Sequence, residues 1–187
     1  MKFIKETVLF ASLALVFAGC HTIHPLSIPE NAIVSEVPAL QKKIGLVLDN
    51  EYRTYINKDR GNPLADPQKY LVGEALAPLT EHYFKRAALE LTTYDSLEAA
   101  RKDSTIAKYD YIIYPKIKEF DNTIRLTEQR IDVVLGAGIY KPDSTLVKDV
   151  EARAMANEGQ DPKKIVSTAL QLALSRLIRE VKKEVAS

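Results

Sequence analysis

The residues best suited to chemistry lie in one short stretch of the chain. Asp49, Asn50 and Glu51 directly follow the apolar run Lys43–Leu48, which we expect to be a central strand. Ligands of open α/β sheets gather beyond the carboxyl ends of strands, so this acidic trio is a candidate cation or substrate site. The alternative interpretation is that these three residues are only the solvated end of the strand, where the chain enters a loop.

Three further side chains extend this candidate site, namely Tyr52, Arg53 and Tyr55. They begin a polar segment, residues 52–68, whose Gly and Pro residues predict turns and a long loop. Loops of this length in compact domains are often functional. We therefore interpret Asp49 to Tyr55 as a ligand or partner surface, with a small molecule or a glycan as the candidate ligand.

The sequence contains none of the common catalytic motifs. A Gly-x-Ser-x-Gly elbow, a Walker loop, a His-Glu-x-x-His pair and a dinucleotide glycine fingerprint are all absent. His21 and His24 have no further ligands at metal-binding spacing. We therefore expect no catalytic residues, no metal and no cofactor, and we predict that the protein is not an enzyme.

Charge and composition limit the partners. The chain has 26 basic and 25 acidic residues and a formal net charge of +1, so this balance indicates neither nucleic acid nor an anionic membrane surface as the partner. A hydrophobic fraction of 46% and a charged fraction of 27% are ordinary for a globular domain. The length of 187 residues suits one such domain.

The N-terminus has the layout of a secretory signal peptide. Lys2 and Lys5 form a positive region, the uncharged apolar run Thr7–Phe17 follows, and small residues close it. This run is too short for a transmembrane helix, which needs roughly 20 apolar residues. The alternative, a buried N-terminal helix, would call for polar positions that the run lacks.

A single cysteine follows this signal. Phe17-Ala18-Gly19-Cys20 resembles the lipobox of bacterial lipoproteins, with Phe17 at a position where Leu is usual. The resemblance implies that signal peptidase recognises Phe17, Ala18 and Gly19. It also implies that Cys20 becomes the mature N-terminus and carries diacylglycerol and an amide-linked acyl chain such as palmitate. Because no second cysteine exists for a disulfide, lipidation would also cap the thiol.

The same resemblance predicts the location and the domain plan. His21 stands where many inner-membrane lipoproteins have Asp, which implies outer-membrane anchoring with the domain facing the periplasm. We expect a signal peptide over residues 1–19, the lipidated cysteine with a Pro-containing tether over 20–41, and one periplasmic domain over 42–187. Such a tether, if extended, could hold the domain roughly 60 Å from the bilayer.

Apolar periodicity predicts two long helices in the domain. The first covers residues 69–88, and Pro78 either kinks it or separates a first turn from the main helix. The second begins with Asp161 as N-cap and Pro162 in the first helical position. The residues expected to be buried are Val72, Leu76, Leu79, Tyr83, Ala87, Val166, Ala169, Leu170, Ala173, Leu177, Ile178 and Val181.

Alternating patterns predict the remaining strands. In chain order we expect a strand over 89–94, a short helix over 97–105 capped by Asp95 or Ser96, a strand over 110–120, a tight turn at Asp121-Asn122, and a hairpin of 123–140 with 145–157. Pairing Tyr140 with Thr145 would place Asp132 opposite Arg153. Pro115 marks an edge, a bulge or an end of regular pairing.

The predicted element order is β-α-β-α-β-β-β-α. It corresponds to an α+β fold with a mixed or antiparallel sheet of about five strands and helices packed on it. With Gly73 early and Phe84 late in the first long helix, this layout resembles small periplasmic lipoproteins of the YajG type and the periplasmic domain of the curli-secretion lipoprotein. The resemblance implies a non-catalytic module that assembles rings or supports export and envelope machinery.

Three functions follow from these observations. The first is a lipid-anchored outer-membrane lipoprotein that serves as an interaction or assembly module, with another protein or further copies of itself as the partner. The second is a periplasmic protein that binds a small ligand or a glycan at Asp49–Tyr55. The third is an envelope hydrolase that uses Asp49 or Glu51.

Overall fold

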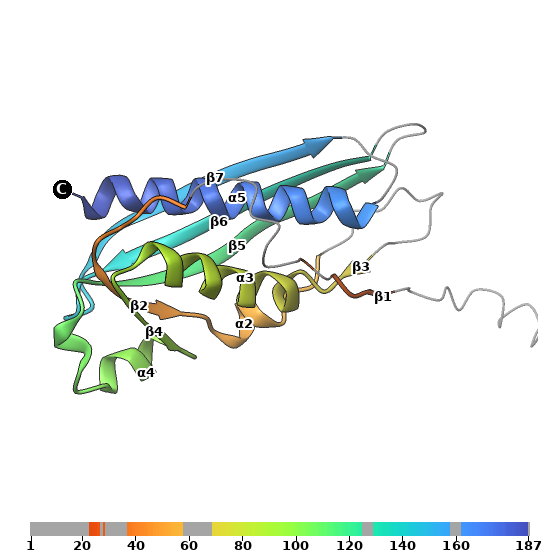
Figure 1. The fold of residues 1–187 in the computed structure, drawn as a ribbon. Coiled ribbons are helices and arrows are strands. Elements are labelled where there is room, and N and C mark those ends of the chain that lie inside the picture. The colour runs from red at the N-terminus through yellow and green to blue at the C-terminus, as the bar shows by residue number, and fades with distance from the viewer. Residues whose placement is uncertain are drawn as a thin grey trace, which may run out of the picture.

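The computed structural model describes residues 23–26, 28, 37–57, 69–124, 129–157 and 162–186. The predicted signal peptide, the lipobox residues, Cys20 and the predicted N-cap Asp161 lie outside these residues. The structure is built on a five-stranded mixed sheet and a short pair of strands, with helices on both faces of the sheet (Figure 1). The predicted α+β class and its sheet of about five strands are confirmed.

The main sheet has the strand order β4-β2-β5-β6-β7. Its members are β2 (Lys43–Val47), β4 (Glu90–Tyr94), β5 (Tyr111–Ile124), β6 (Gln129–Tyr140) and β7 (Leu146–Asn157). β2 pairs in parallel with β4 and β5, whereas β5, β6 and β7 pair antiparallel. A separate parallel pair consists of β1 (Ile23–His24) and β3 (Lys69–Tyr70).

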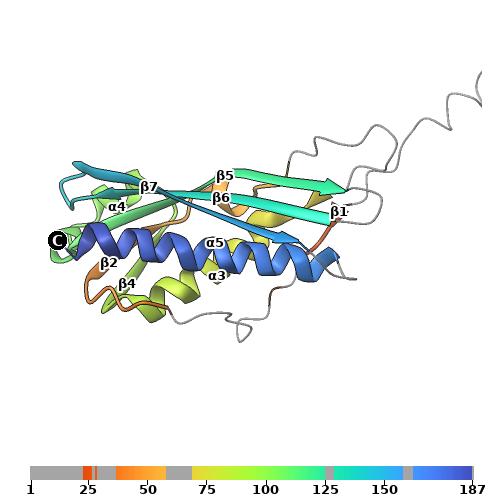
Figure 2. The same cartoon turned by 90° about the horizontal axis from the view of Figure 1, so that it is seen from above.

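Helices cover the sheet unequally. They are α2 (Asn50–Arg53), α3 (Val72–Ala87), α4 (Leu97–Lys102), the 3-10 helix η1 (Ile106–Lys108) and α5 (Pro162–Val185). α5 runs along β6 and β7 with α3 beside it, as both views show (Figure 2). α4 and η1 close a smaller apolar cluster on the opposite face, near β2. All the helix residues expected to be buried are buried.

Two predicted boundaries are wrong, and one of the two alternatives at Pro78 is excluded. α3 begins at Val72, because Lys69 and Tyr70 form β3. The same helix runs through Pro78 without interruption, so no separate first turn exists. α4 ends at Lys102, since the Asp103 carboxylate accepts hydrogen bonds from the backbone N–H and the hydroxyl of Thr105 and so favours a turn there. The predicted cap by Ser96 is confirmed, with its hydroxyl accepting from Ala99 N at 2.9 Å.

The predicted tight turn at Asp121-Asn122 is also wrong. β5 continues to Ile124, and Asp121 and Asn122 pair with Asp132 and Ile131 in the ladder with β6. Thr123 and Ile124, which were expected to begin the hairpin strand 123–140, belong to β5, and β6 is described from Gln129. Asp and Asn favour turns on average, but here strand pairing on both sides of the dipeptide overrides that local preference.

The hairpin register differs from the predicted one by two residues along most of its length. Val133 pairs with Ala154 and Asp132 with Met155, rather than Val133 with Ala152 and Asp132 with Arg153. A larger turn explains this, because Tyr140 pairs with Leu146 and the ladder is irregular at that point. A shift by two keeps every side chain on its predicted face, so the apolar face was assigned correctly.

Residues 20–41 were expected to form an extended tether, and the described part of this segment contacts the domain. Ile23 and His24 form β1 against β3. Leu26, Ile28 and Val37 pack on the main core. Leu40 is itself buried there, and its N–H donates to the carbonyl of Ala87 at 2.8 Å. These residues are therefore part of the folded body rather than a free spacer.

α2 and α3 touch through their backbones at Gly73. An added Cβ there would lie 2.3 Å from the carbonyl oxygen of Tyr52 and 2.5 Å from the backbone nitrogen of Tyr55. The N–H of Gly73 also donates to the carbonyl of Tyr55 at 2.9 Å. Only glycine permits this approach, which fixes α2 beside the end of β2.

We predict that Gly73→Ala destabilises the protein by about 1–3 kcal/mol or more, because a methyl group would push two backbone segments apart. Alanine is the better helix former, so the loss would come from the clash and not from helix propensity. Chemical denaturation measures it.

Gly136→Ala is the matched control. There the added Cβ would meet the Cε of Lys118 at 2.6 Å, and that side chain is 43% exposed and able to move aside. We expect its effect to stay within about 0.5 kcal/mol. Equal losses in the two variants would contradict the assigned role of Gly73.

Candidate functional site

The acidic trio after β2 begins a helix instead of a loop. Asp49 is the N-cap of α2, and one of its carboxylate oxygens accepts from Tyr52 N at 2.8 Å. The other oxygen accepts a hydrogen bond from the hydroxyl of Tyr114 on β5. Asp49 therefore ties the end of β2, the first turn of α2 and β5 together, which is the work of a capping residue.

Tyr52 points into the fold, whereas Arg53 is partly exposed. Tyr52 is 3% exposed, and its hydroxyl donates to Thr80 Oγ1 at 2.7 Å, since that hydroxyl itself donates to the carbonyl of Leu76. Burial raises the pKa of Tyr52 above its ordinary range. Arg53 donates through Nε to the carbonyl of Leu48 at 2.8 Å. Tyr52 is therefore too deeply buried to form an exposed partner surface, whereas the Arg53 side chain is 39% exposed and its Nη2 lies 3.4 Å from Asp95 Oδ1.

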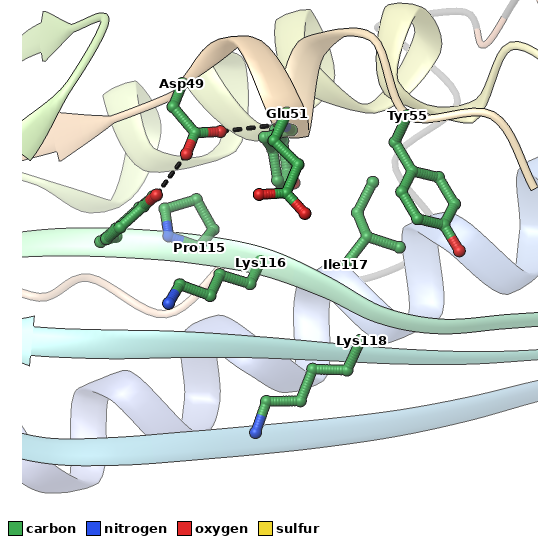
Figure 3. Close-up of a pocket in the computed structure, with 9 residues that line it drawn as sticks. Asp49, Glu51, Tyr55, Pro115, Lys116, Ile117 and Lys118 are labelled. Carbon is green, nitrogen blue, oxygen red and sulfur yellow. Dashed lines mark hydrogen bonds between the residues drawn. The ribbon is translucent and has the colours of Figure 1, made fainter.

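Asn50 and Glu51 are exposed on α2, and Tyr55 is half-buried against the main core. Figure 3 shows Glu51 pointing from α2 toward β5, between Asp49 and Tyr55. The six predicted residues are thus divided. Asp49, Tyr52 and Arg53 bond to the surrounding structure. Asn50 is exposed, and Glu51 and Tyr55 line the space between α2 and β5.

A pocket of about 230 Å³ lies between α2 and β5. It is lined by Asp49, Glu51, Tyr52, Tyr55, Tyr114, Pro115, Lys116, Ile117 and Lys118. It forms where β2 stops pairing with β5 at Ile113. Pro115 lies just beyond this point, so the prediction that it marks an end of regular pairing is confirmed on the β2 side.

Most charges in this pocket already have partners. Lys116 Nζ lies 4.8 Å from the centre of the Tyr114 ring, and Lys118 forms an ion pair with Glu151 on β7. Burial, followed by the hydrogen bond to Asp49 and the nearby carboxylate charges, raises the pKa of Tyr114 to about 12. At neutral pH the Tyr114 hydroxyl therefore keeps its proton and serves as a donor, not as a base.

The geometry offers no support for acid–base or metal chemistry at Asp49. Both of its carboxylate oxygens accept hydrogen bonds from the fold. Across the ranges that the structure describes, no group of three His, Cys, Asp or Glu residues could hold a metal ion. Nor is any helix in those ranges both long and apolar enough to cross a membrane.

A second hollow, of about 350 Å³, lies near the far ends of the long strands and was not anticipated from the sequence. It is lined by Asp121, Thr123, Gln129, Arg130, Asp132, Arg153 and Asn157. Asp132 is only 6% exposed and forms ion pairs with Arg130 at 2.7 Å and with Arg153 at 3.3 Å. The Arg153 pair is diagonal across the ladder, because Arg153 itself pairs with Val134. The sequence held a signal for it, the charged residues alternating along both strands of the hairpin.

The open edge of β7 is the other feature that sequence reasoning missed. β7 ends the sheet order, and no strand pairs with its other side among the described residues. Two large apolar side chains on its outer face, Val147 and Met155, are 40% and 46% exposed. Arg176 of α5 covers one point of this edge, where its Nη1 donates to the carbonyl of Arg153 at 2.6 Å. Such an edge can pair with a strand of another chain.

Comparison with known proteins identifies the fold only. No protein-family model matches the sequence, and no curated protein matches it. A crystal structure from Xanthomonas campestris described with the family name DUF330 is similar, with a TM-score of 0.55 at 11% identity over 86% of this chain and 92% of that one. The hypothetical protein CT253 from Chlamydia trachomatis has a TM-score of 0.50 at 8% identity over 78% and 98%.

A looser match is PelC from Paraburkholderia phytofirmans, a dodecamer in its crystal. It has a TM-score of 0.45 at 10% identity over 81% of this chain and 92% of that chain. The first two matches show that this chain shares its fold with bacterial proteins from distant species.

We predict that Asp49→Ala lowers the free energy of unfolding by about 1–3 kcal/mol, because it removes the helix cap and the acceptor of the Tyr114 hydroxyl. Asn50→Ala is the matched control at the neighbouring exposed position, and we expect its effect to stay within about 0.5 kcal/mol. Urea denaturation measures both. Unchanged stability in Asp49→Ala would contradict the structural role of this carboxylate and would favour a role in ligand binding or in a reaction.

Proposed function

We propose that the protein is a lipid-anchored lipoprotein of the bacterial outer membrane. The N-terminal signal, the lipobox-like Phe17-Ala18-Gly19-Cys20 and the single cysteine support this proposal. The folded body would face the periplasm and act without catalysis, as an interaction or assembly module. Its fold is shared with bacterial proteins of 11% and 8% identity, and since a fold alone does not assign a function, the role has to be argued from surfaces and sites.

The observation that carries the assembly role is the exposed edge of β7. The strand is twelve residues long, and its outward side chains include Val147 and Met155. Proteins ordinarily protect such edges with charge, proline or a covering element. β7 carries the exposed charged side chains Lys148, Asp149, Glu151 and Arg153. The covering contact that the described residues supply is the bond from Arg176 to the carbonyl of Arg153, so most backbone groups of the edge are left uncovered. Most of the edge is therefore open to a strand from a partner.

The sequence of β7 suits pairing with a second copy of itself. In an antiparallel pair centred on Glu151, Asp149 would face Arg153 of the other copy and Val147 would face Met155. The two Glu151 side chains would meet at the centre, each already neutralised by its ion pair with Lys118. A two-fold axis thus brings opposite charges and apolar side chains together.

The alternatives receive less support. A pocket lies beside Asp49, but Asp49, Tyr52 and Lys118 are engaged in internal bonds. A ligand would have to rely chiefly on Glu51 and Lys116. A hydrolase would need a carboxylate available for proton transfer. Both oxygens of Asp49 accept hydrogen bonds from the fold, which leaves Glu51 as the candidate for that role.

Analytical ultracentrifugation tests the assembly role on the mature chain from residue 20, with Cys20→Ser to prevent lipidation. We expect the mass to rise from monomer to dimer between about 1 and 100 µM, the range of a modest interface. The double variant Val147→Lys, Met155→Lys should remain monomeric, because each lysine places charge on the edge.

The control for this experiment is Leu89→Lys, which changes a side chain that is 72% exposed and lies outside β7. It should associate as the parent chain does. A parent chain that stays monomeric across the whole range, or a Leu89→Lys variant that loses association equally, would contradict pairing through β7.

A further inference from the structure

The segment just after the anchor cysteine is bound to the folded body. Ile23 and His24 pair with Lys69 and Tyr70 as the β1–β3 ladder. If Cys20 is the mature N-terminus, only residues 20–22 separate the lipid from this ladder. Three residues span at most about 10 Å even when fully extended. A spacer of that length cannot hold a domain clear of a bilayer.

From this we infer that the domain lies directly against the phospholipid bilayer, with its β1–β3 end toward the lipid. The inference rests on the lipid anchor of the proposed function and specifies how the anchored domain is oriented. It replaces the picture of a domain suspended on a spacer that reaches roughly 60 Å. The bound partner at this end is therefore the membrane surface itself.

The β1–β3 ladder is attached to the main core and not to a peripheral loop. Tyr70 is 1% exposed, and its ring lies 6.3 Å from that of Phe120 on β5. Its backbone N–H donates to Asn57 Oδ1 at 2.5 Å. Leu26 and Ile28 continue the attachment by packing on the same core. Releasing the segment would expose these apolar side chains to water, which opposes detachment.

The end of the molecule that faces the bilayer follows from the arrangement of the elements. In both ribbon views, β1 and β3 lie at the end where β5 finishes, β6 begins and α5 starts, and the C-terminus lies at the other end (Figures 1 and 2). α5 has 24 residues. At 1.5 Å per residue this helix is about 36 Å long, so its two ends would differ strongly in distance from the lipid.

The chemistry of that end suits phospholipid headgroups. The register pairs Arg130 with Asn157, which places the Arg130–Asp132–Arg153 cluster at the starting end of β6. The side chains of Arg130 and Arg153 are 50% and 61% exposed. Arg130 reaches Asp132 through Nε, and a guanidinium has five N–H donors. Guanidinium groups can bind phosphate oxygens in a bidentate way. Because Asp121 and Asp132 line the same hollow as the two arginines, the cluster has no net charge and suits zwitterionic headgroups.

Energy transfer from the protein to the membrane surface tests this orientation. The lipidated chain is reconstituted in phospholipid vesicles whose outer headgroups carry an acceptor dye. Because lipid blocks the sole native cysteine, a donor dye can be placed at Asn157→Cys or at Ala186→Cys, two exposed positions at opposite ends of the molecule. We expect at least twofold more efficient transfer from position 157 than from position 186.

A variant with ten Gly and Ser residues inserted between Thr22 and Ile23 is the matched control. The insert adds roughly 17 Å of root-mean-square reach and lets the domain turn, so the two positions should become similar. Equal transfer from both positions without the insert would overturn the proposed orientation. Failure of the lipidated preparation to float with vesicles would instead overturn the anchor, and with it the basis of the orientation.

Discussion

The packing of α3 and α5 against the inner face of the sheet is the interaction on which the rest of the structure depends. The helix side chains at this interface are buried, and each buried Leu, Ile or Val contributes about 1.5–3 kcal/mol. This packing fills one side of the long β5–β6–β7 ladder. On the opposite face of this ladder, charged side chains are exposed, and the outer edge of β7 is unpaired among the described residues. The same arrangement thus determines both the apolar core and the exposed edge.

The same core also holds the N-terminal segment, and an ion-paired cluster lies near it. β1 and the residues from Leu26 to Ile28 that the structure describes attach the N-terminal segment near the start of α5. The ion-paired cluster around Asp132 lies at that end of the sheet. The end that we propose faces the membrane and the edge that we propose binds a partner therefore belong to the same packed body.

Much of the fold could be predicted from the sequence, because long amphipathic elements carry a strong pattern. The buried stripe of α5 and the alternation in β6 and β7 were assigned correctly. The register was not, since it depends on the geometry of the turn between Tyr140 and Leu146 and a two-residue shift preserves the pattern. The two-residue strands β1 and β3 are too short for any periodicity and form only through tertiary contact.

For the candidate site, the sequence located the residues but could not decide their role. An acidic cluster after a strand indicates a ligand site as readily as it indicates a helix cap, and only the positions of Tyr52 and Tyr114 decide between the two. Asp49 followed by Glu51 within a first turn was the available signal for a helix start. The local sequence therefore singled out Asp49, but only the surrounding structure shows what this residue does.

We propose above all that acyl chains on Cys20 hold the folded domain at a membrane. Intact mass spectrometry of the protein purified from membranes of its native cell measures this directly. We predict a chain that begins at Cys20 and carries a diacylglycerol and one further acyl group. An intact residue 1–19 leader together with an unmodified thiol at Cys20 would contradict the account.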